Sequence, residues 1–303
     1  MQDTHATNTA QQQLRSGLLL ATAGTALFAL KSIFIKLAYA EGVDTTTLLT
    51  LRMVLSLPFY FGILLWLVLK EKKPLPRGNA LYAIFGLGFI GYYFSSYLDM
   101  EALNYISAQL ERLTLYSYPI MTTLLGWLFL KEVITRKIFL SLLLTYSGVM
   151  LLYGYEADST GHDATKGVLM VAAAALMFSC YVVFSKSLIT KVGSRLFTSI
   201  AMLSSTLYTL IHFSITHQWA DLNVSTSIWA YAILLAIFST VLPSFMISEA
   251  IARIGPAKTS IVGTAGPVFT VMLAVIFLGE PFGSLHFVGM ALVMLGVALL
   301  GKR

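Results

Sequence analysis

Long apolar stretches, separated by short segments that carry most of the charged residues, limit this chain to very few folds. Ten of these stretches lie at residues 17–39, 46–69, 79–99, 107–130, 135–154, 167–189, 196–216, 227–250, 257–278 and 284–301. A helix needs about twenty mostly apolar residues to cross the hydrocarbon layer of a membrane. Hydrophobic residues make up 57% of the 303 and charged residues only 11%, which is too few to cover a soluble fold. We predict an all-α membrane protein with ten transmembrane helices.

Basic residues in the loops predict how the chain is oriented. One side of the ten-span arrangement carries Arg15, Lys70, Lys72, Lys73, Arg77, Lys131, Arg136, Lys137, Lys191, Arg195, Arg253, Lys258, Lys302 and Arg303. Because cytoplasmic loops hold an excess of Lys and Arg, both termini are predicted to be cytoplasmic. The net charge of +6 then reflects topology, and no nucleic-acid partner is expected. The polar residues 1–16, with no apolar stretch followed by a cleavage site, are interpreted as a disordered cytoplasmic tail.

The two halves of the sequence are similar to each other. Gly17, Phe28, Phe34 and Lys36 recur 150 residues later as Gly167, Phe178, Phe184 and Lys186. Glu101, Pro119, Glu132 and Gly148 recur 148 residues later as Glu249, Pro267, Glu280 and Gly296. These matches predict two five-span repeats, 17–155 and 167–303, joined by an extracytoplasmic linker at 156–166. Since each half has an odd number of spans, the second half is inverted in the membrane, an arrangement that suits alternating access.

Four charged residues lie inside predicted spans, where a charge costs a few kcal/mol and is a functional hypothesis by default. They are Lys31, Arg52, Glu111 and Arg112, and their equivalents in the second half are uncharged. Three cations against one acid predict a substrate that carries a carboxylate or another anionic group. Glu111 would then hold an amino group of the substrate or carry a coupling proton.

An alternative explains the same four residues without a ligand. Glu111 would pair with Arg52 or Lys31, and Arg112 would reach the lipid headgroups by snorkelling. Arg112 lies close to the end of its span and fits this alternative. Lys31 lies too far inside its span to reach water unless a cavity brings water to it, which favours a functional role. For Arg52 both interpretations stay open.

Gly and Pro interruptions occupy corresponding positions of two spans, which is the best sequence indication of a transporter's binding site. One span reads Tyr116-Ser117-Tyr118-Pro119 and the other Gly263-Thr264-Ala265-Gly266-Pro267. Pro119, Gly263, Gly266 and Pro267 predict kinks or gating points near the middle of both helices. Freed backbone carbonyls there, together with Tyr116, Tyr118 and Thr264, are predicted to contact a solute, and Tyr93 and Tyr181 to line the same cavity. Tyrosines facing glycines suit a planar cargo, although ordinary helix packing produces the same pattern.

Small residues predict one close helix contact. Ser141 and Gly148 correspond to Gly289 and Gly296, and the members of each pair are seven residues apart, which places them on one helix face. Such residues let two helices approach closely, within a monomer or across a homodimer. We assign them no chemistry.

The span-end segment Phe277-Leu278-Gly279-Glu280-Pro281 and its weaker copy Phe129-Leu130-Lys131-Glu132 complete a pattern that resembles a known family. With the paired five-span halves, this chain is similar to the EamA family of the drug/metabolite transporter superfamily. In the first copy, Lys131 and Val133 depart from the Gly and Pro of the pattern. The resemblance implies ten helices around a central cavity and the export or exchange of small metabolites such as amino acids. It does not imply one particular substrate.

Other sequence features exclude competing classes of protein. No Walker motif and no H-E-x-x-H motif occur, Cys180 is the single cysteine, and the glycines Gly86, Gly88 and Gly91 lie inside a span instead of after a strand. We predict a secondary active transporter without cofactor or metal, and not an enzyme. Its partners would be a small polar solute, protons and the lipid bilayer, as a monomer or homodimer. It would reside in the cell membrane, the inner one in a Gram-negative bacterium. The alternative is a flippase for lipids or lipid-linked metabolites on the same fold.

Overall fold

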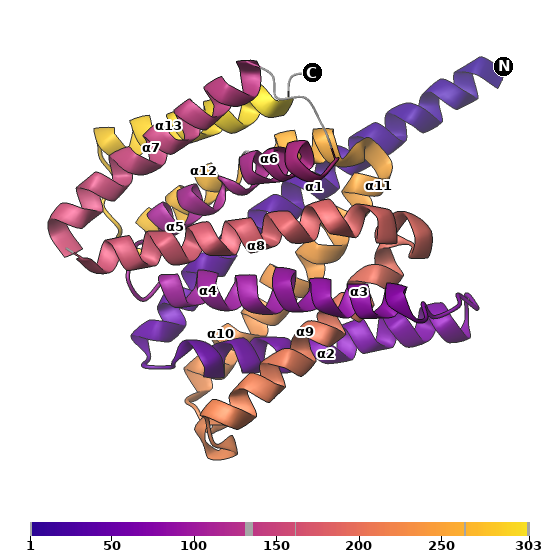
Figure 1. The fold of residues 1–303 in the computed structure, drawn as a ribbon, viewed down its shortest axis with the longest axis horizontal. Coiled ribbons are helices and arrows are strands. Elements are labelled where there is room, and N and C mark those ends of the chain that lie inside the picture. Colours follow the sequence, from indigo (N-terminus) through magenta and orange to yellow (C-terminus); the bar gives the residue numbers. More distant parts are fainter. Residues whose placement is uncertain (1, 131–135, 161, 264, 302–303) are drawn as a thin grey trace.

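The chain is helical almost throughout the residues that the structure describes. The computed structural model describes residues 2–130, 136–160, 162–263 and 265–301, and these ranges contain no β-strand. The α-helices (Figure 1) are α1 (Gln2–Ala40), α2 (Thr45–Leu69), α3 (Asn79–Gly88), α4 (Ser95–Ala102), α5 (Ala108–Leu115), α6 (Tyr118–Leu130), α7 (Arg136–Thr160), α8 (His162–Val192), α9 (Ser194–Thr216), α10 (Thr226–Ala236), α11 (Leu242–Gly263), α12 (Gly266–Leu273) and α13 (Ser284–Gly301). Short irregular helices are the π-helical segments η1 (Phe89–Phe94), η3 (Ile237–Val241) and η4 (Ala274–Leu278) and the 3₁₀ helix η2 (Trp219–Leu222).

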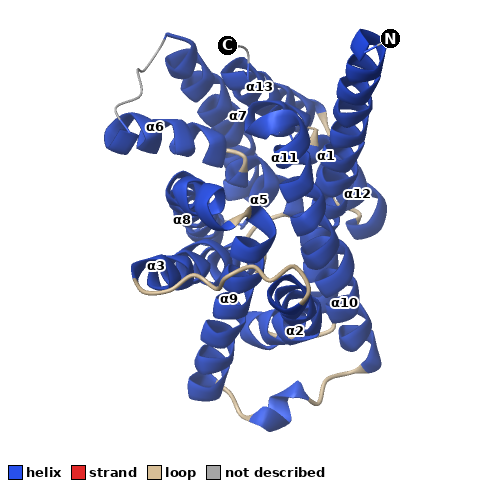
Figure 2. Ribbon diagram, turned by 90° about the vertical axis from the view of Figure 1, so that its right-hand side faces the viewer, coloured by secondary structure: helices blue, strands red, loops and turns tan. Residues whose placement is uncertain are grey.

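Helices that are distant in the sequence pack against each other. The long α1 packs along α11, α2 along α9, α4 along α8, and α7 along α13 at one edge of the bundle (Figure 1). The start of α1 and the connection between α2 and α3 lie toward one end of the bundle, on the right of Figure 1, whereas the turn between α1 and α2 lies at the opposite end. Figure 2, which views the first of these ends, looks along the axes of α2 and α8.

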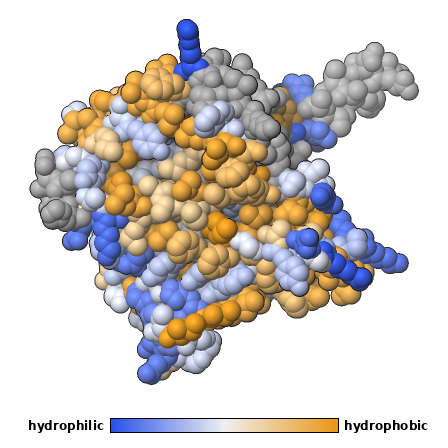
Figure 3. Space-filling view, viewed as in Figure 1, coloured by the Kyte–Doolittle hydropathy of each residue, from blue (hydrophilic) through white to orange (hydrophobic). Residues whose placement is uncertain are grey.

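The surface of the bundle suits lipid better than water. Six helical stretches are long and apolar enough to cross a membrane: Gln11–Ala40, Thr45–Leu69, Asn79–Ala102, Asp163–Ser185, Ser194–Thr216 and Thr226–Ile247. Shorter apolar helices are Phe139–Tyr155, Gly266–Leu278 and Ser284–Leu299. Large apolar side chains such as Leu19, Phe139 and Ile215 are exposed on the outside, and hydrophobic residues cover much of the face shown in Figure 3. Exposed apolar area on this scale marks a membrane-embedded surface, so the protein is an all-helical membrane protein.

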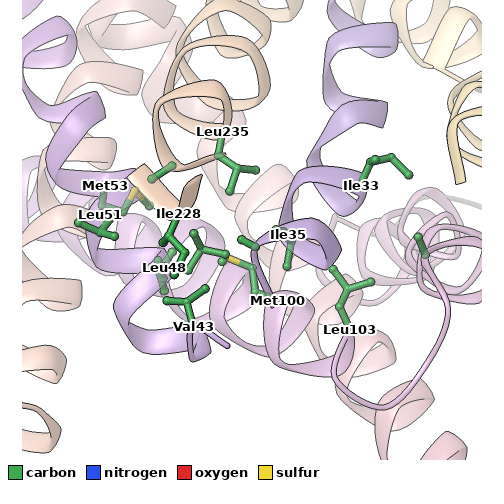
Figure 4. Close-up of a cluster of buried hydrophobic side chains, with 14 of the residues drawn as sticks. Ile33, Ile35, Val43, Leu48, Leu51, Met53, Met100, Leu103, Ile228 and Leu235 are labelled. Carbon is green, nitrogen blue, oxygen red and sulfur yellow. The ribbon is translucent and has the colours of Figure 1, made fainter. Parts of the chain in front are cut away.

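The main hydrophobic core lies where α1, α2, α4 and α10 meet. Figure 4 shows Ile35 of α1 close to Met100 of α4, with Ile33 farther along α1 and with Leu48 of α2 and Leu235 of α10 on the other side of the methionine. All five side chains are fully or almost fully buried. Because Ile33 directly follows Lys31 and Ser32 in α1, this core holds the part of α1 that carries these two polar residues.

The structure differs from the sequence prediction in three segments outside the predicted spans. α1 begins at Gln2, where a disordered tail was predicted for residues 1–16; no Gly or Pro interrupts residues 2–16, and extending an existing helix avoids the cost of nucleation. α7 and α8 both extend into the predicted linker at 156–166, and Asp163 in the first turn of α8 interacts favourably with the helix dipole. α11 runs through the loop predicted after residue 250, where Glu249 and Arg253 form an i,i+4 ion pair of 2.9 Å that supports helix.

Two of the ten predicted spans are interrupted near their middles. Tyr116 and Ser117 form a turn between α5 and α6, just before Pro119. The second interruption follows Gly263, and α12 then begins at Gly266 with Pro267 in its first turn. Pro fixes its own φ and has no N–H to donate, so it starts a new helical segment more easily than it continues one.

Two π-helical segments also occupy corresponding positions in the sequence. η1 begins at residue 89 and η3 at residue 237, a separation of 237 − 89 = 148 residues, which equals one of the offsets found in the sequence. A π-helical turn holds an extra residue and is frequent at functional sites. Both segments therefore mark places at which side chains depart from regular helical spacing.

The close helix contact predicted from small residues is present between α7 and α13 of the same chain. A Cβ atom added at Gly148 would meet the carbonyl oxygen of Gly289, and one added at Gly296 would meet the backbone at Ser141 and Thr145. The Ser141 hydroxyl donates a hydrogen bond to the carbonyl of Gly296. Without side chains at these glycines, the two helix backbones come into direct contact.

Gly148→Ala should therefore destabilise the protein, by about 1–3 kcal/mol, because the added methyl group overpacks a contact made by backbone atoms. Gly154→Ala, on the same helix with nothing within 4 Å of the added Cβ, is the matched control. It should leave stability unchanged or raise it slightly, since Ala favours helix over Gly. The measurement is the apparent melting temperature of the purified protein in detergent, followed by tryptophan fluorescence. Equal shifts for both variants would contradict the α7–α13 contact.

Candidate functional site

Charged side chains from three helices meet in the interior of the bundle. We call Lys31 and Ser32 of α1, Asp99 of α4, and Glu111 and Arg112 of α5 the charge cluster. The Lys31 ammonium forms an ion pair with Asp99. The Ser32 hydroxyl donates to Glu111 Oε2 at 2.6 Å, and Arg112 Nη2 donates to the same hydroxyl at 3.0 Å. All five side chains are buried or nearly so, and Glu111 is completely inaccessible.

The start of α5 determines where Glu111 and Arg112 lie. Ser107 caps this helix by accepting a hydrogen bond from the Leu110 N–H at 3.0 Å. Glu280, from the segment before α13, accepts from the N–H groups of Ala108 and Gln109 at 2.7 and 3.3 Å. The first N–H groups of a helix have no partner within it, and a carboxylate there also interacts favourably with the helix dipole. Glu111 thus enters the bundle one turn after an anchored helix start.

Arg52 of α2 forms a second polar group, the arginine cluster, with Tyr60, Thr240 and Ser244. Its Nε donates to Thr240 Oγ1 at 2.7 Å and its Nη1 contacts Met100 Sδ at 3.5 Å. The Tyr60 hydroxyl lies 2.9 Å from Ser244 Oγ and donates to the Thr240 carbonyl at 3.3 Å. Thr240 belongs to the π-helical segment η3, whose extra residue per turn leaves carbonyls and hydroxyls available to side chains.

Arg52 differs from the other internal cations in its partners. Lys31 is paired with Asp99, and Arg112 Nε lies 4.0 Å from Glu111 Oε2. Within the part of the chain that the structure describes, no carboxylate lies within 4.0 Å of Arg52, although only 4% of this residue is exposed. The two clusters adjoin, because Met100, which contacts Arg52, directly follows Asp99.

The predicted tyrosines occupy two different places. The Tyr116 hydroxyl donates to the carbonyl of Gly263 at 2.5 Å and lies directly over Gly266, so one side chain joins the two helix interruptions. Tyr118 packs edge-on against Phe178 at 5.3 Å, and Phe178 stacks on Tyr181 at 5.7 Å. Interruptions within a membrane need polar partners for their free carbonyls, and Tyr116 supplies one.

Not every predicted residue joins the charged groups. Tyr181 packs against Tyr92 at 5.0 Å, and Tyr92 interacts electrostatically with Arg52, so Tyr181 lies near the arginine cluster. Tyr93 instead contacts Phe89, Tyr208 and His212. Thr264 lies outside the described residues. Of the predicted set, the structure thus brings together Lys31, Glu111 and Arg112, with Arg52 next to them.

Sequence reasoning missed five participants, which are Ser32, Tyr60, Asp99, Thr240 and Ser244. Asp99 was placed at the end of its predicted span, but α4 continues to Ala102, so the carboxylate lies within a membrane helix. Ser32, Tyr60 and Thr240 carry no charge and gave no signal of their own. Ser32 is adjacent to Lys31, and Ser56 and Tyr60 lie four and eight residues after Arg52. Residues at this second spacing form a polar stripe along one helix face, which the sequence pattern indicates.

Both the sequence and the fold of this chain are similar to those of known proteins. The sequence pattern of the EamA-like transporter family matches residues 15–154 and again residues 165–302. The uncharacterized transporter YcbK of Bacillus subtilis is 27% identical over 292 residues, covering 92% of this chain and 90% of that protein. The S-adenosylmethionine/S-adenosylhomocysteine transporter of Chlamydia trachomatis is 27% identical over 254 residues, covering 78% of this chain and 75% of that protein. A protein crystal structure superimposes with a TM-score of 0.66 at 17% identity, over 94% of this chain and 96% of that one, which shows a shared fold.

Asp99→Asn should destabilise the protein strongly, by about 3–5 kcal/mol, because it leaves the buried Lys31 ammonium without its counter-ion. Adding Lys31→Met to this variant should recover part of the loss, since the double variant buries no unpaired charge. The apparent melting temperatures of the two single variants and the double variant measure this coupling. Glu249→Gln, at a partly exposed ion pair with Arg253, is the control and should cost no more than about 1 kcal/mol. A double variant less stable than Asp99→Asn would contradict the pairing.

Proposed function

This chain belongs to the EamA-like transporter family, and from that premise we propose that it is a secondary active carrier, an exporter or exchanger, of small amino-acid-like metabolites that bear a carboxylate. Membership of this family shows that the protein is a multi-pass membrane transporter and not an enzyme. We propose in addition that its substrate bears a carboxylate, that transport occurs by alternating access, and that Arg52 binds the substrate.

We propose that the chain crosses the membrane ten times as two inverted five-helix halves, residues 17–155 and 167–303, around a central cavity. Two observations support this arrangement. The family pattern matches the chain twice in succession, and the π-helical segments η1 and η3 are 148 residues apart. Halves related in this way exchange conformations by alternating access. Both termini are then cytoplasmic, as the basic loops predict.

The single observation that carries the substrate proposal is the unpaired charge of Arg52. A buried guanidinium without a carboxylate partner is costly within a membrane, and a substrate carboxylate would supply the missing charge. Arginine presents parallel N–H donors that match the two oxygens of a carboxylate. Lys31 is paired with Asp99, and Arg112 donates to Ser32 with Glu111 4.0 Å away. We propose that these two cations position the site and that Arg52 binds the substrate carboxylate.

The aromatic side chains near Arg52 support a substrate with an apolar or planar part. Tyr92, Tyr181, Phe178 and Tyr118 follow one another at ring distances of 5.0 to 5.7 Å. One relative is named as a transporter of S-adenosylmethionine and S-adenosylhomocysteine, two compounds that combine an α-amino acid with a planar base. We propose that this chain likewise binds the amino-acid part of its substrate at Arg52, with the tyrosines beside it.

Purified protein in proteoliposomes tests the proposal by counterflow of labelled amino acids, S-adenosylmethionine, organic anions and organic cations. We expect saturable exchange of carboxylate-bearing solutes. Arg52→Gln should raise KM for them about 10- to 100-fold, because a hydrogen bond to a charged group contributes about 1.5–3 kcal/mol. Arg52→Lys should give an intermediate KM, since it keeps the charge but loses the paired donors.

Arg195→Gln, which alters a half-exposed arginine away from both clusters, is the matched control and should leave KM unchanged. Exchange of the same solutes with equal KM in Arg52→Gln would contradict the role of Arg52. Absence of exchange throughout the panel, together with scrambling of fluorescent lipids, would replace the metabolite carrier by a lipid flippase.

A further inference from the structure

We propose that Asp99 and Glu111 form a proton-binding site in which their two carboxyl groups share one proton. The site itself is a property of the charge cluster. Its use to couple proton movement to transport rests on the function proposed above. Asp99 belongs to α4 and Glu111 to α5, and their hydrogen-bond partners Lys31 and Ser32 are adjacent residues of α1.

The unpartnered oxygens of the two carboxyl groups lead to this proposal. Asp99 Oδ2 accepts from Lys31, and Glu111 Oε2 accepts from Ser32. The other oxygen of each, Asp99 Oδ1 and Glu111 Oε1, is buried and receives no hydrogen bond from any residue that the structure describes. The two carboxyl groups interact with each other electrostatically. Each carboxyl group thus buries an unsatisfied acceptor oxygen close to another negatively charged group.

A single proton resolves this arrangement. Two ionised carboxylates side by side repel each other, and each would bury an acceptor that lacks a partner. When one group is protonated, its O–H donates to the other, and both free oxygens are satisfied. Glu111 is the better proton carrier, because Asp99 has a direct ion pair with Lys31 whereas Glu111 has a hydroxyl at 2.6 Å and a guanidinium 4.0 Å away.

The surrounding groups favour a proton over a metal cation. The charged and titratable side chains that interact with the pair are Lys31 and Tyr39 of α1, Arg52 of α2, Arg112 of α5, and Tyr116 after α5. Three of these are cationic. A sodium ion would need several oxygen ligands in a site whose net charge attracts it, while a shared proton needs only the two facing oxygens.

The position of the pair beside Arg52 connects proton binding to substrate binding. Met100, the neighbour of Asp99, contacts the guanidinium of Arg52, and Arg52 interacts electrostatically with Asp99. A substrate carboxylate on Arg52 would offset the positive charge that favours ionised carboxyl groups. Protonation of the pair then becomes easier, and by reciprocity a proton on the pair favours anion binding. Proton and carboxylate would therefore cross the membrane together.

Infrared difference spectroscopy of the purified protein tests the site without a substrate. Between acidic and alkaline buffer we expect a carbonyl stretching band from a protonated buried carboxyl group, lost in Glu111→Gln and lost or shifted in Asp99→Asn. Glu111→Gln keeps the side-chain shape and can still donate to Asp99, so it should fold even if Asp99→Asn does not. Glu249→Gln is the control and should keep the band. A band that Glu111→Gln leaves unchanged overturns the proposal.

Proteoliposomes containing a pH-sensitive dye test the coupling. With wild-type protein we expect inward substrate flux to acidify the lumen, and a pH gradient to drive accumulation. In Glu111→Gln, accumulation should fall to the level reached without a gradient, whereas Glu249→Gln should accumulate substrate as the wild-type protein does. Counterflow with no movement of protons in wild-type protein would overturn the coupling and leave the proposed function intact. Failure of all counterflow, with the infrared band present and sensitive to Glu111→Gln, would overturn the proposed function and leave the proton site intact.

Discussion

The cost of burying charge inside a membrane is the constraint on which the rest of this structure depends. An isolated charge within the bundle is costly, so each charged side chain there needs a partner or a ligand. Lys31 has Asp99, and Arg112 has Ser32 with Glu111 nearby. These pairs join α1, α4 and α5 in the middle of the bundle. Arg52 has neutral partners only among the described residues, which separates it from the groups that hold the helices together.

The same constraint applies to the backbone where helices are interrupted. A free carbonyl or N–H within the membrane must find a partner in the protein, because lipid offers none. Tyr116, from the interruption between α5 and α6, donates to Gly263 at the interruption before α12. Glu280 accepts from the first N–H groups of α5. The interruption before α12 and the start of α5 are thus each supported by a residue from the other half of the sequence.

The sequence predicted a helical membrane protein correctly, because apolar length and charge-free composition are local properties. It also predicted the interruptions at Pro119 and Pro267 and the close contact at Gly148, since Gly and Pro act on the backbone at their own positions. It failed where a partner comes from far away. Thr240 is 188 residues from Arg52 and acts through a π-helical turn that no residue pattern announces. Asp99 was missed because the end of a helix cannot be placed from composition more closely than a few residues.

The sequence repeat relates the two halves of the chain, but the cations of both clusters have uncharged equivalents in the second half. Position 31 holds a lysine in the first half and its equivalent in the second half is Tyr181, and Arg52 corresponds to Met202. Arg52 of the first half is nevertheless bound to Thr240 of the second. Under the proposed two-half arrangement, a relative movement of the halves must change the contacts of this guanidinium. A substrate held by Arg52 would then be sensitive to the conformational change itself, which is the requirement for a binding group in alternating access.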